Sequence, residues 1–298
     1  MPNEGPSMEA GAEQRLLRHG LSNPFAKSVP DALGGGRCGI CHGNAFQKFL
    51  ECRSLDSEFA PLYVCRICGG IYNATAEFNQ LDVVEWQQRW AEDPEFYKVP
   101  SGKEFEAQLE EARVTIRFFE DDLGFQFSGN YVEIGAGSGI MAAAALKHFD
   151  RVYVFDHVQD RLQQVREIVG KDYHVMDFEG LSDVSADAVL IWHAMEHFLD
   201  PGGVFQMAAA ILNPGGYFLI QVPVLSEEHV YPGHYYFYSE PTFRLLANKF
   251  GLNVEHFYYD HALNAMTVAL KKNSAAAVGL NGPTGSYKEL SIASPSAE

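Results

Sequence analysis

Apolar positions in the second half of the chain follow two alternating patterns, which predict a repeated succession of strand and helix. Short apolar runs typical of buried strands occur at 131–134, 152–155, 173–176, 188–192 and 217–222. Helical spacing of apolar residues occurs between these runs, at 140–148, 160–169, 204–212 and 241–250. Two more apolar segments, 254–259 and 265–271, are expected to close the sheet as an antiparallel pair. The alternation predicts an α/β domain whose mostly parallel sheet carries helices on both faces.

The pattern changes outside this domain and divides the chain into five parts. Residues 77–127 are expected to be a helical bridge or lid, because apolar side chains recur three or four positions apart at Phe105, Leu109, Ala112, Ile116 and Phe119. The terminal segments are poor in large apolar residues and are expected to be disordered tails. The predicted parts are 1–30 (tail), 31–76 (a cysteine-rich segment), 77–127 (bridge), 128–272 (the α/β domain) and 273–298 (tail).

A glycine-rich turn follows the first strand of the α/β domain. It reads Glu133-Ile-Gly-Ala-Gly-Ser-Gly139, so the spacing is G-x-G-x-G. A dinucleotide site needs G-x-G-x-x-G, and its third glycine would fall at Ile140. A turn that begins with a carboxylate suits a ligand with positive charge, such as S-adenosylmethionine, which has a sulfonium and an ammonium group and no phosphate. The alternative is a glycine turn without a ligand.

Acidic residues end the next two strands. Asp156 lies 156 − 135 = 21 positions after the first glycine, where an ionised carboxylate can accept hydrogen bonds from both ribose hydroxyls. Asp177 ends the third strand beside Phe178 and is placed to accept a hydrogen bond from an adenine amino group. Either acid could instead cap the following helix.

These motifs together resemble the class I S-adenosylmethionine-dependent methyltransferases. The resemblance is carried by EIGAGSG, VFD, VMDF, VLIWHAMEHFLDP and LNPGGYFLIQVP, and it covers residues 128–272. It implies a Rossmann-like sheet of seven strands with the last strand antiparallel. The cofactor contacts that we expect are Glu133, Gly135, Ala136, Gly137, Asp156, His157, Asp177, Phe178 and His193.

Candidate catalytic residues follow the fourth strand, where His193, Glu196 and His197 lie in the sequence WHAMEH. Carboxyl ends of strands in such sheets face the ligand crevice, so these side chains are expected near the transferable methyl group. Histidine suits removal of a proton at neutral pH, and His197 is the first candidate base. The alternative is that one of these histidines is structural. A catalytic zinc bound by two of these histidines is not expected, because no third ligand is evident from the spacing.

An aromatic segment, His229–Ser239, lies between the fifth strand and the next helix. Its counterpart in related enzymes borders the substrate pocket, and His234 within it is the second candidate base. Its four consecutive aromatic residues are not all expected to face inward. They are Tyr235, Tyr236, Phe237 and Tyr238.

Two pairs of cysteines precede the α/β domain, each with two intervening residues. With 23 residues between the pairs, they predict two turns that together bind one zinc ion with four thiolates, and such a closed site is structural. His42 is a less favoured substitute ligand, and Cys52 is expected to be a packed thiol outside the site. The predicted ligands are Cys38, Cys41, Cys65 and Cys68.

This cysteine-rich segment resembles a known N-terminal zinc ribbon. The sequences RCGICHGNAF and PLYVCRICGGIYN resemble the zinc-binding head of bacterial methyltransferases that act on sugars and other secondary metabolites. The resemblance implies O- or C-methylation of a secondary-metabolite or sugar-like acceptor. The sugar C-methyltransferases continue with a long C-terminal domain that has no counterpart here, which leaves the acceptor open.

The net charge of the chain helps to distinguish a small-molecule acceptor from a nucleic-acid acceptor. Lys and Arg number 22 against 39 Asp and Glu, a formal net charge of -17 that disfavours nucleic acid as a partner. A zinc-headed ribosomal RNA methyltransferase is therefore the first alternative, and it also lacks the Asn/Asp-Pro-Pro-Tyr signature expected after the fourth strand. A protein that binds S-adenosylmethionine without catalysis is the second alternative, although the intact glycine turn and acids argue against it.

The sequence also bears on location and assembly. No apolar run approaches the roughly 18 residues of a membrane-spanning helix, and the start of the chain lacks the features of a secretory signal. A small-molecule methyltransferase in the cytoplasm is therefore expected, with no membrane partner. A homodimer remains an open alternative for its oligomeric state.

Overall fold

The computed structural model describes residues 37–43, 46–52, 60–74, 99–156, 159–170 and 172–274. The predicted tails (except residues 273 and 274), the first part of the predicted bridge (77–98), and His157 lie outside the described residues. The side chains of Cys52 and Phe178 lie outside them as well. No helix within the described ranges is long and apolar enough to cross a membrane.

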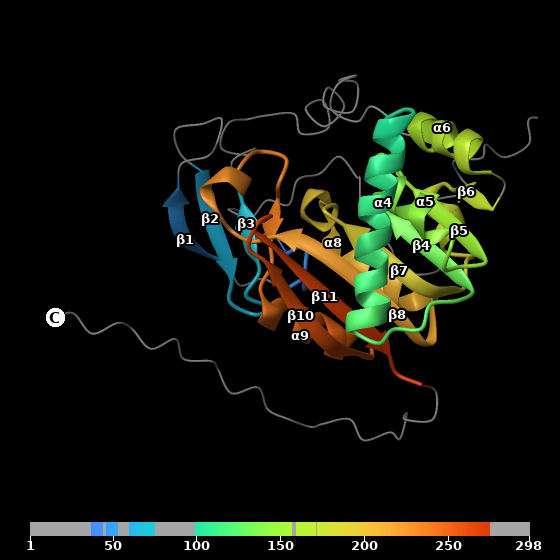
Figure 1. Ribbon diagram of the computed structural model, residues 1–298. Helices are drawn as coiled ribbons and strands as arrows, with labels where there is room; N and C mark the ends of the chain where they lie inside the picture. The colour runs from blue at the N-terminus through green and yellow to red at the C-terminus, as the bar shows by residue number, and fades with distance from the viewer. Residues whose placement is uncertain are drawn as a thin grey trace, which may run out of the picture.

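A sheet of seven strands forms the centre of the molecule (Figure 1). Its spatial order is β10-β11-β8-β7-β4-β5-β6, with parallel pairing from β8 through β6 and antiparallel pairing of β11 with both of its neighbours. The strands are β4 (Asn130–Ile134), β5 (Arg151–Phe155), β6 (Tyr173–Val175), β7 (Ala186–Trp192), β8 (Leu212–Pro223), β10 (Leu252–Asp260) and β11 (Ala265–Lys272). The predicted α/β architecture, with its closing antiparallel pair, is confirmed.

Helices connect these strands and cover the sheet. The α-helices are α4 (Lys103–Arg117), α5 (Ile140–Ala145), α6 (Gln159–Val169), α7 (Phe178–Leu181), α8 (Pro201–Ile211) and α9 (Glu240–Lys249). The short helical segments are the π-helix η1 (Phe118–Asp122) and the 3-10 helices η2 (Met195–His197) and η3 (Glu227–His229).

Alternate residues of the central strands enter two different apolar cores. In β4, Val132 and Ile134 belong to the core that contains α8 and α9, whereas Tyr131 belongs to the core that contains α4, α5 and α6. This follows from the strand geometry, which points successive side chains to opposite faces of the sheet. Because helices cover both faces, the strands are apolar on both sides, as their sequences predict.

Helix α4 confirms the apolar stripe predicted within residues 77–127. Phe105, Leu109 and Ile116 are 4–5% exposed, and all three belong to the same core as α5. The helix continues into the π-helix η1, where Phe119 is 2% exposed. Figure 1 shows α4 running alongside α5.

A second sheet of four antiparallel strands lies beside the first, in the order β1-β2-β3-β9. Three of its strands come from the cysteine-rich segment, namely β1 (Phe46–Cys52), β2 (Ala60–Cys65) and β3 (Ile71–Asn73). The fourth strand, β9 (Tyr236–Phe237), comes from the aromatic segment of the α/β domain. The cysteine-rich segment therefore completes its sheet with a strand from the larger domain.

The prediction that the four consecutive aromatic residues would not all face inward is wrong. Tyr235, Tyr236 and Phe237 are each 1% exposed and Tyr238 is 6% exposed. The reason is that β9 is covered on both faces. Tyr236 packs in the main core with Tyr72, whereas Phe237 packs on the other side with Leu62.

Candidate functional site

The glycine turn after β4 adopts a backbone that requires glycine. Gly135, Gly137 and Gly139 have φ angles of 75°, 53° and 73°, in the left-handed region that glycine tolerates best. A Cβ added at Gly135 would lie 2.4 Å from the Cβ of Ala194, which follows β7. The turn and the residues after β7 are therefore in direct contact. This is the point where the chain switches from one side of the sheet to the other, and such points bind ligands in open α/β sheets.

Glu133 is the last but one residue of β4 and is 2% exposed. The Tyr131 hydroxyl donates a hydrogen bond of 2.9 Å to its Oε2 atom. Burial raises the pKa of Glu133 to about 8, and the nearby Asp156 carboxylate adds to this effect. In the ligand-free protein, the Glu133 carboxyl group therefore holds its proton at neutral pH.

Asp156 directly follows β5 and is 7% exposed. Its Oδ2 atom accepts a hydrogen bond of 2.9 Å from the backbone N–H of Gly137. The backbone N–H groups of Gly135 and Ala136 donate to the Phe155 carbonyl at 2.8 and 3.1 Å. The glycine turn is thus attached to the end of β5 and to the Asp156 side chain.

Asp177 is exposed and follows β6. Its Oδ1 atom accepts a hydrogen bond of 2.6 Å from the backbone N–H of Gly180, in the first turn of α7. Asp177 therefore caps α7, which is the alternative role that the sequence allowed for this residue. A carboxylate has two oxygens, so capping leaves room for a second acceptor role.

His193 lies immediately after β7 and has a φ angle of 49°. A left-handed backbone is uncommon for a side chain of this size, and such conformations gather at functional sites. Its side chain is 38% exposed, and its Nδ1 atom lies 3.8 Å from Glu196 Oε1. Burial opposes its charged form, but Glu196 raises the pKa of His193 above its ordinary value.

Glu196, His197 and His234 form a compact cluster whose ligand atoms all lie within 4.8 Å of one another. Glu196 and His197 belong to the 3-10 helix η2, which begins after His193. Glu196 is 1% exposed, with its Oε1 atom 3.9 Å from His234 Nε2. Burial opposes the ionisation of Glu196, but His193, His197 and His234 together lower its pKa.

His234 is 5% exposed and both of its ring nitrogens have neighbours. Nδ1 lies 2.9 Å from the His229 carbonyl, and Nε2 lies 2.5 Å from the Tyr231 hydroxyl. Burial and the adjacent His197 lower the pKa of His234 to about 3. The ring is therefore neutral at physiological pH and is a poor candidate for a base that must hold a proton.

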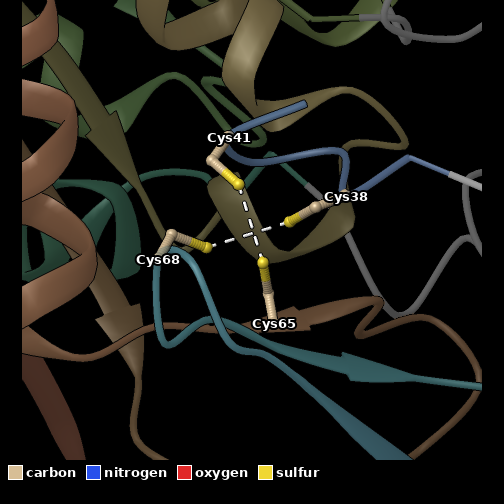
Figure 2. A group of neighbouring side chains, drawn as sticks. All are labelled: Cys38, Cys41, Cys65 and Cys68. Carbon is tan, nitrogen blue, oxygen red and sulfur yellow. Dashed lines mark hydrogen bonds between the residues drawn. The ribbon is translucent and has the colours of Figure 1, made fainter. Parts of the chain in front are cut away.

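The four predicted cysteines meet at one point, with their sulfur atoms directed to a common centre (Figure 2). The Sγ atoms of Cys38 and Cys68 are 3.8 Å apart, and those of Cys41 and Cys65 are 3.6 Å apart. Four sulfurs at about 2.3 Å from a zinc ion form a tetrahedron with edges of about 3.8 Å. The cluster therefore fits a tetrahedral zinc ion.

The two cysteine turns have the same backbone hydrogen bonds. In the first turn, the His42 N–H donates to the Cys38 carbonyl and the Cys38 N–H to Gly43, at 2.8 and 2.9 Å. In the second, the Gly69 N–H donates to the Cys65 carbonyl at 2.8 Å. His42 and Gly69 occupy matching left-handed positions, with φ angles of 65° and 74°. The two turns therefore have the same geometry, which agrees with the predicted pair of metal-binding turns.

The first cysteine turn rests on the start of α8. His42 Nε2 lies 2.9 Å from Asp200 Oδ1, so His42 faces the α/β domain and lies outside the group of four cysteines. Asp200 also accepts a hydrogen bond of 2.9 Å from the Gly203 N–H and caps α8. The Gly202 N–H donates to the Gly39 carbonyl at 2.8 Å. Asp200 and Gly202, at the start of α8, thus connect the α/β domain to the first cysteine turn.

Sequence reasoning missed several residues that organise the site. Tyr131 lies two positions before Glu133 on the same face of β4, so the strand period could have found it. Asn73 donates 3.0 Å hydrogen bonds to the carbonyls of Tyr231 and His234 across 158 and 161 positions of sequence. No local pattern could have indicated those contacts.

Comparisons with known proteins agree with this arrangement. A family model described as a methyltransferase domain matches residues 106–257. A ubiquinone biosynthesis O-methyltransferase from Methylocella silvestris is 30% identical over 92 residues, a match that covers 28% of this chain and 36% of that enzyme. The chain therefore matches about a third of the length of that curated relative.

Solved structures with a similar fold include other methyltransferases. An O-methyltransferase family protein from Burkholderia thailandensis has a TM-score of 0.48 and 14% identity, with 63% of each chain covered. The magnesium protoporphyrin IX methyltransferase of Synechocystis PCC 6803, with bound S-adenosylhomocysteine, has a TM-score of 0.46 and 12% identity. That match covers 67% of this chain and 95% of the Synechocystis chain.

The seven-stranded sheet, its antiparallel last strand and the glycine turn at the switch point define the Rossmann-like class of methyltransferases. The family match extends over half of the chain, from α4 to β10. The chain belongs to the methyltransferase domain family, and it is an enzyme of that family.

Proposed function

We propose that this chain transfers a methyl group from S-adenosylmethionine to an oxygen or carbon atom of a small-molecule metabolite. One observation carries the proposal. The glycine turn, with buried acids at the ends of β4 and β5, directly adjoins the histidine and glutamate cluster after β7. A cofactor cradle and groups able to accept a proton thus lie at the same edge of the sheet.

Three acids would hold the cofactor. Asp156 would accept hydrogen bonds from the ribose hydroxyls, and Asp177 from the adenine amino group. Glu133, a buried residue of β4 two positions before Gly135, would counter the positive charge of the cofactor. When bound, S-adenosylmethionine supplies an electrophilic methyl carbon, which leaves the sulfonium sulfur for the acceptor atom while the sulfur keeps the electron pair.

We propose His193 as the residue that removes the acceptor proton. It is the most exposed of the three histidines near Glu196, and its left-handed backbone places it directly after β7. Glu196 lies 3.8 Å from its Nδ1 atom, which favours a proton on Nδ1 and leaves Nε2 as the basic nitrogen. His197, the first candidate from the sequence, lies deeper, beside His234.

The acceptor class follows from charge and from the relatives. A formal net charge of -17 disfavours the phosphate backbone of RNA, so the ribosomal RNA alternative lacks support. The ubiquinone enzyme and the magnesium protoporphyrin enzyme are named for small-molecule substrates. Similarity to the ubiquinone enzyme supports a metabolite acceptor. The resemblance of the cysteine-rich segment to the zinc-binding head of bacterial methyltransferases supports a secondary-metabolite or sugar-like one.

We also propose that Cys38, Cys41, Cys65 and Cys68 bind one structural Zn²⁺ ion. The sulfur spacings match a zinc tetrahedron, and four protein ligands leave no position for substrate.

Substitution Asp156→Ala is expected to weaken binding of S-adenosylhomocysteine at least tenfold. It removes a buried carboxylate that accepts charge-assisted hydrogen bonds, each worth about 1.5–3 kcal/mol. Isothermal titration calorimetry of the purified protein measures this. The control is Asp172→Ala, an exposed acid in the turn before β6, which should bind normally. Equal affinity of Asp156→Ala and the unchanged protein would remove the ribose assignment.

Substitution His193→Ala is expected to lower the rate of methyl transfer by about 10²- to 10⁴-fold, a much larger effect than any loss of cofactor affinity. The base must be unprotonated, so the rate of the unchanged enzyme should fall as pH drops through a pKa above 6.5, the ordinary value. Radiolabelled methyl transfer to a panel of phenols and sugars measures the rate. The exposed His261→Ala is the matched control. A His193→Ala enzyme with the same pH profile as the original would assign the proton transfer to another residue.

A further inference from the structure

We infer that Glu196, His197 and His234 form a second metal site, for a divalent first-row transition metal. Their ligand atoms lie within 4.8 Å of one another, and they come from two separate segments, η2 and the loop before β9. Two imidazoles with one carboxylate are a donor set that suits such cations. The site differs from the four-cysteine cluster in place and in donor chemistry.

The two histidines are already oriented as metal ligands usually are. His197 Nδ1 lies 2.8 Å from the Gly233 carbonyl, and His234 Nδ1 lies 2.9 Å from the His229 carbonyl. A carbonyl can only accept, so each Nδ1 donates its proton and each Nε2 keeps a lone pair. A backbone carbonyl in this role fixes the tautomer and the ring orientation of metal-binding histidines.

Glu196 supplies an oxygen that lacks a partner. Its Oε2 atom is buried and has no hydrogen-bond partner among the described residues. A buried carboxylate oxygen without a hydrogen bond is costly, and it is rare in folded proteins. Coordination to a cation would satisfy this atom. A purely structural network of the same three residues would leave it unexplained.

The loop that carries His234 is anchored on both sides. The Tyr235 N–H donates to the Glu196 carbonyl at 2.8 Å, which ties the loop to η2. The side-chain amide of Asn73, in β3, donates to the carbonyls of Tyr231 and His234 at 3.0 Å each. The cysteine-rich segment thus holds one of the proposed ligands in position, although it contributes none.

Metal binding requires two local changes. Two ligands about 2.1 Å from one ion lie roughly 3.0–3.4 Å apart at octahedral or tetrahedral angles, so the separations in the cluster must shorten. The distance between His234 Nε2 and Glu196 Oε1, now 3.9 Å, must decrease by about half an ångström. The Tyr231 hydroxyl, now 2.5 Å from His234 Nε2, must give up that hydrogen bond to the cation.

A cation here would lie next to His193, the proposed base. It would polarise a hydroxyl of the acceptor while His193 takes the proton. This catalytic role of the cation rests on the proposed function. Binding of the cation is a separate property, which can be measured without cofactor or acceptor.

Titration with Mn²⁺, followed by the electron paramagnetic resonance signal of the free ion, tests the site. The full chain is first loaded with one equivalent of Zn²⁺ to fill the cysteines, which Mn²⁺ cannot displace because it binds more weakly. About one Mn²⁺ per chain is expected to bind. Affinity should fall at least tenfold in His234→Ala and Glu196→Gln. His193→Ala, whose side chain is equally near Glu196, should bind as well as the original.

Tyr231→Phe gives a test that does not remove a ligand. Without its hydroxyl, residue 231 no longer competes with the cation for His234 Nε2, so Mn²⁺ should bind more tightly. Failure of the folded, zinc-loaded protein to bind Mn²⁺ would overturn the second site, as would equal affinity in His234→Ala and Glu196→Gln. Binding of S-adenosylhomocysteine, measured separately, reports on the proposed function and is independent of either result.

Discussion

Removal of the metal proposed at the four cysteines is expected to lower the melting temperature of the whole protein by about 10 °C or more. Structural zinc contributes several kcal/mol or more to folding, and each kcal/mol shifts the melting temperature of a domain of this size by about 2–4 °C. Substitution Cys65→Ser should have the same effect, because a hydroxyl is a poor substitute for one of four thiolates.

The loss is expected to spread beyond the cysteine-rich segment because the two parts share a core. Cys38, Cys65 and Tyr72 belong to the same apolar cluster as residues of β7, α8 and α9. Strand β9 pairs with β3, and Asn73 holds the loop that carries His234. Loss of the metal should therefore disorder the cysteine-rich segment and also part of the cluster of Glu196, His197 and His234.

Thermal unfolding followed by circular dichroism, together with metal analysis of the same samples, measures this effect. The control is Cys52→Ser, the same substitution at a cysteine that ends β1. It should retain about one zinc per chain and the original melting temperature. If chelator-treated protein contains no metal but has the same melting temperature as the original protein, zinc has no structural role.

The fold was predictable because each of its determinants is local. The central strands β4 and β7 are buried and mostly apolar on both faces, and the glycines at 135, 137 and 139 are needed for the left-handed turn between β4 and α5. The cysteine spacing predicted two similar turns, which is what the backbone hydrogen bonds show. Such features depend on residues that are close in sequence, so one sequence is enough to find them.

The arrangement around Glu196 was not predictable, because it depends on contacts between distant segments. The sequence placed Glu196 and His197 together, but it could not show that His234 joins them from the loop before β9. The burial of all four aromatic residues has the same origin. The cysteine-rich segment covers them from the second side. Its strand β3 pairs with β9 across 236 − 72 = 164 positions of sequence, and only this pairing reveals the contact.

The second large expected effect is a dependence of folding stability on pH, and it arises from the proton on the buried Glu133. Burial, together with the nearby Asp156, raises its pKa from an ordinary 4.5 to about 8. The native protein therefore keeps a proton between pH 4.5 and 8 that the unfolded chain releases. This contribution to stability is fully present below pH 4.5 and is lost as pH rises towards 8, at up to about 1.4 kcal/mol per pH unit.

Substitution Glu133→Gln is accordingly expected to stabilise the ligand-free protein at pH 8 by a few kcal/mol, while it weakens cofactor binding. The cationic cofactor lowers the pKa of Glu133, so binding near pH 7 should release up to one proton and strengthen as pH rises. Calorimetry of S-adenosylmethionine binding in buffers of different ionisation enthalpy counts the released proton. The exposed Glu106→Gln, on α4, is the control and should release the same proton as the original. Binding without proton release, at an affinity independent of pH, would show that Glu133 does not face the charge of the cofactor.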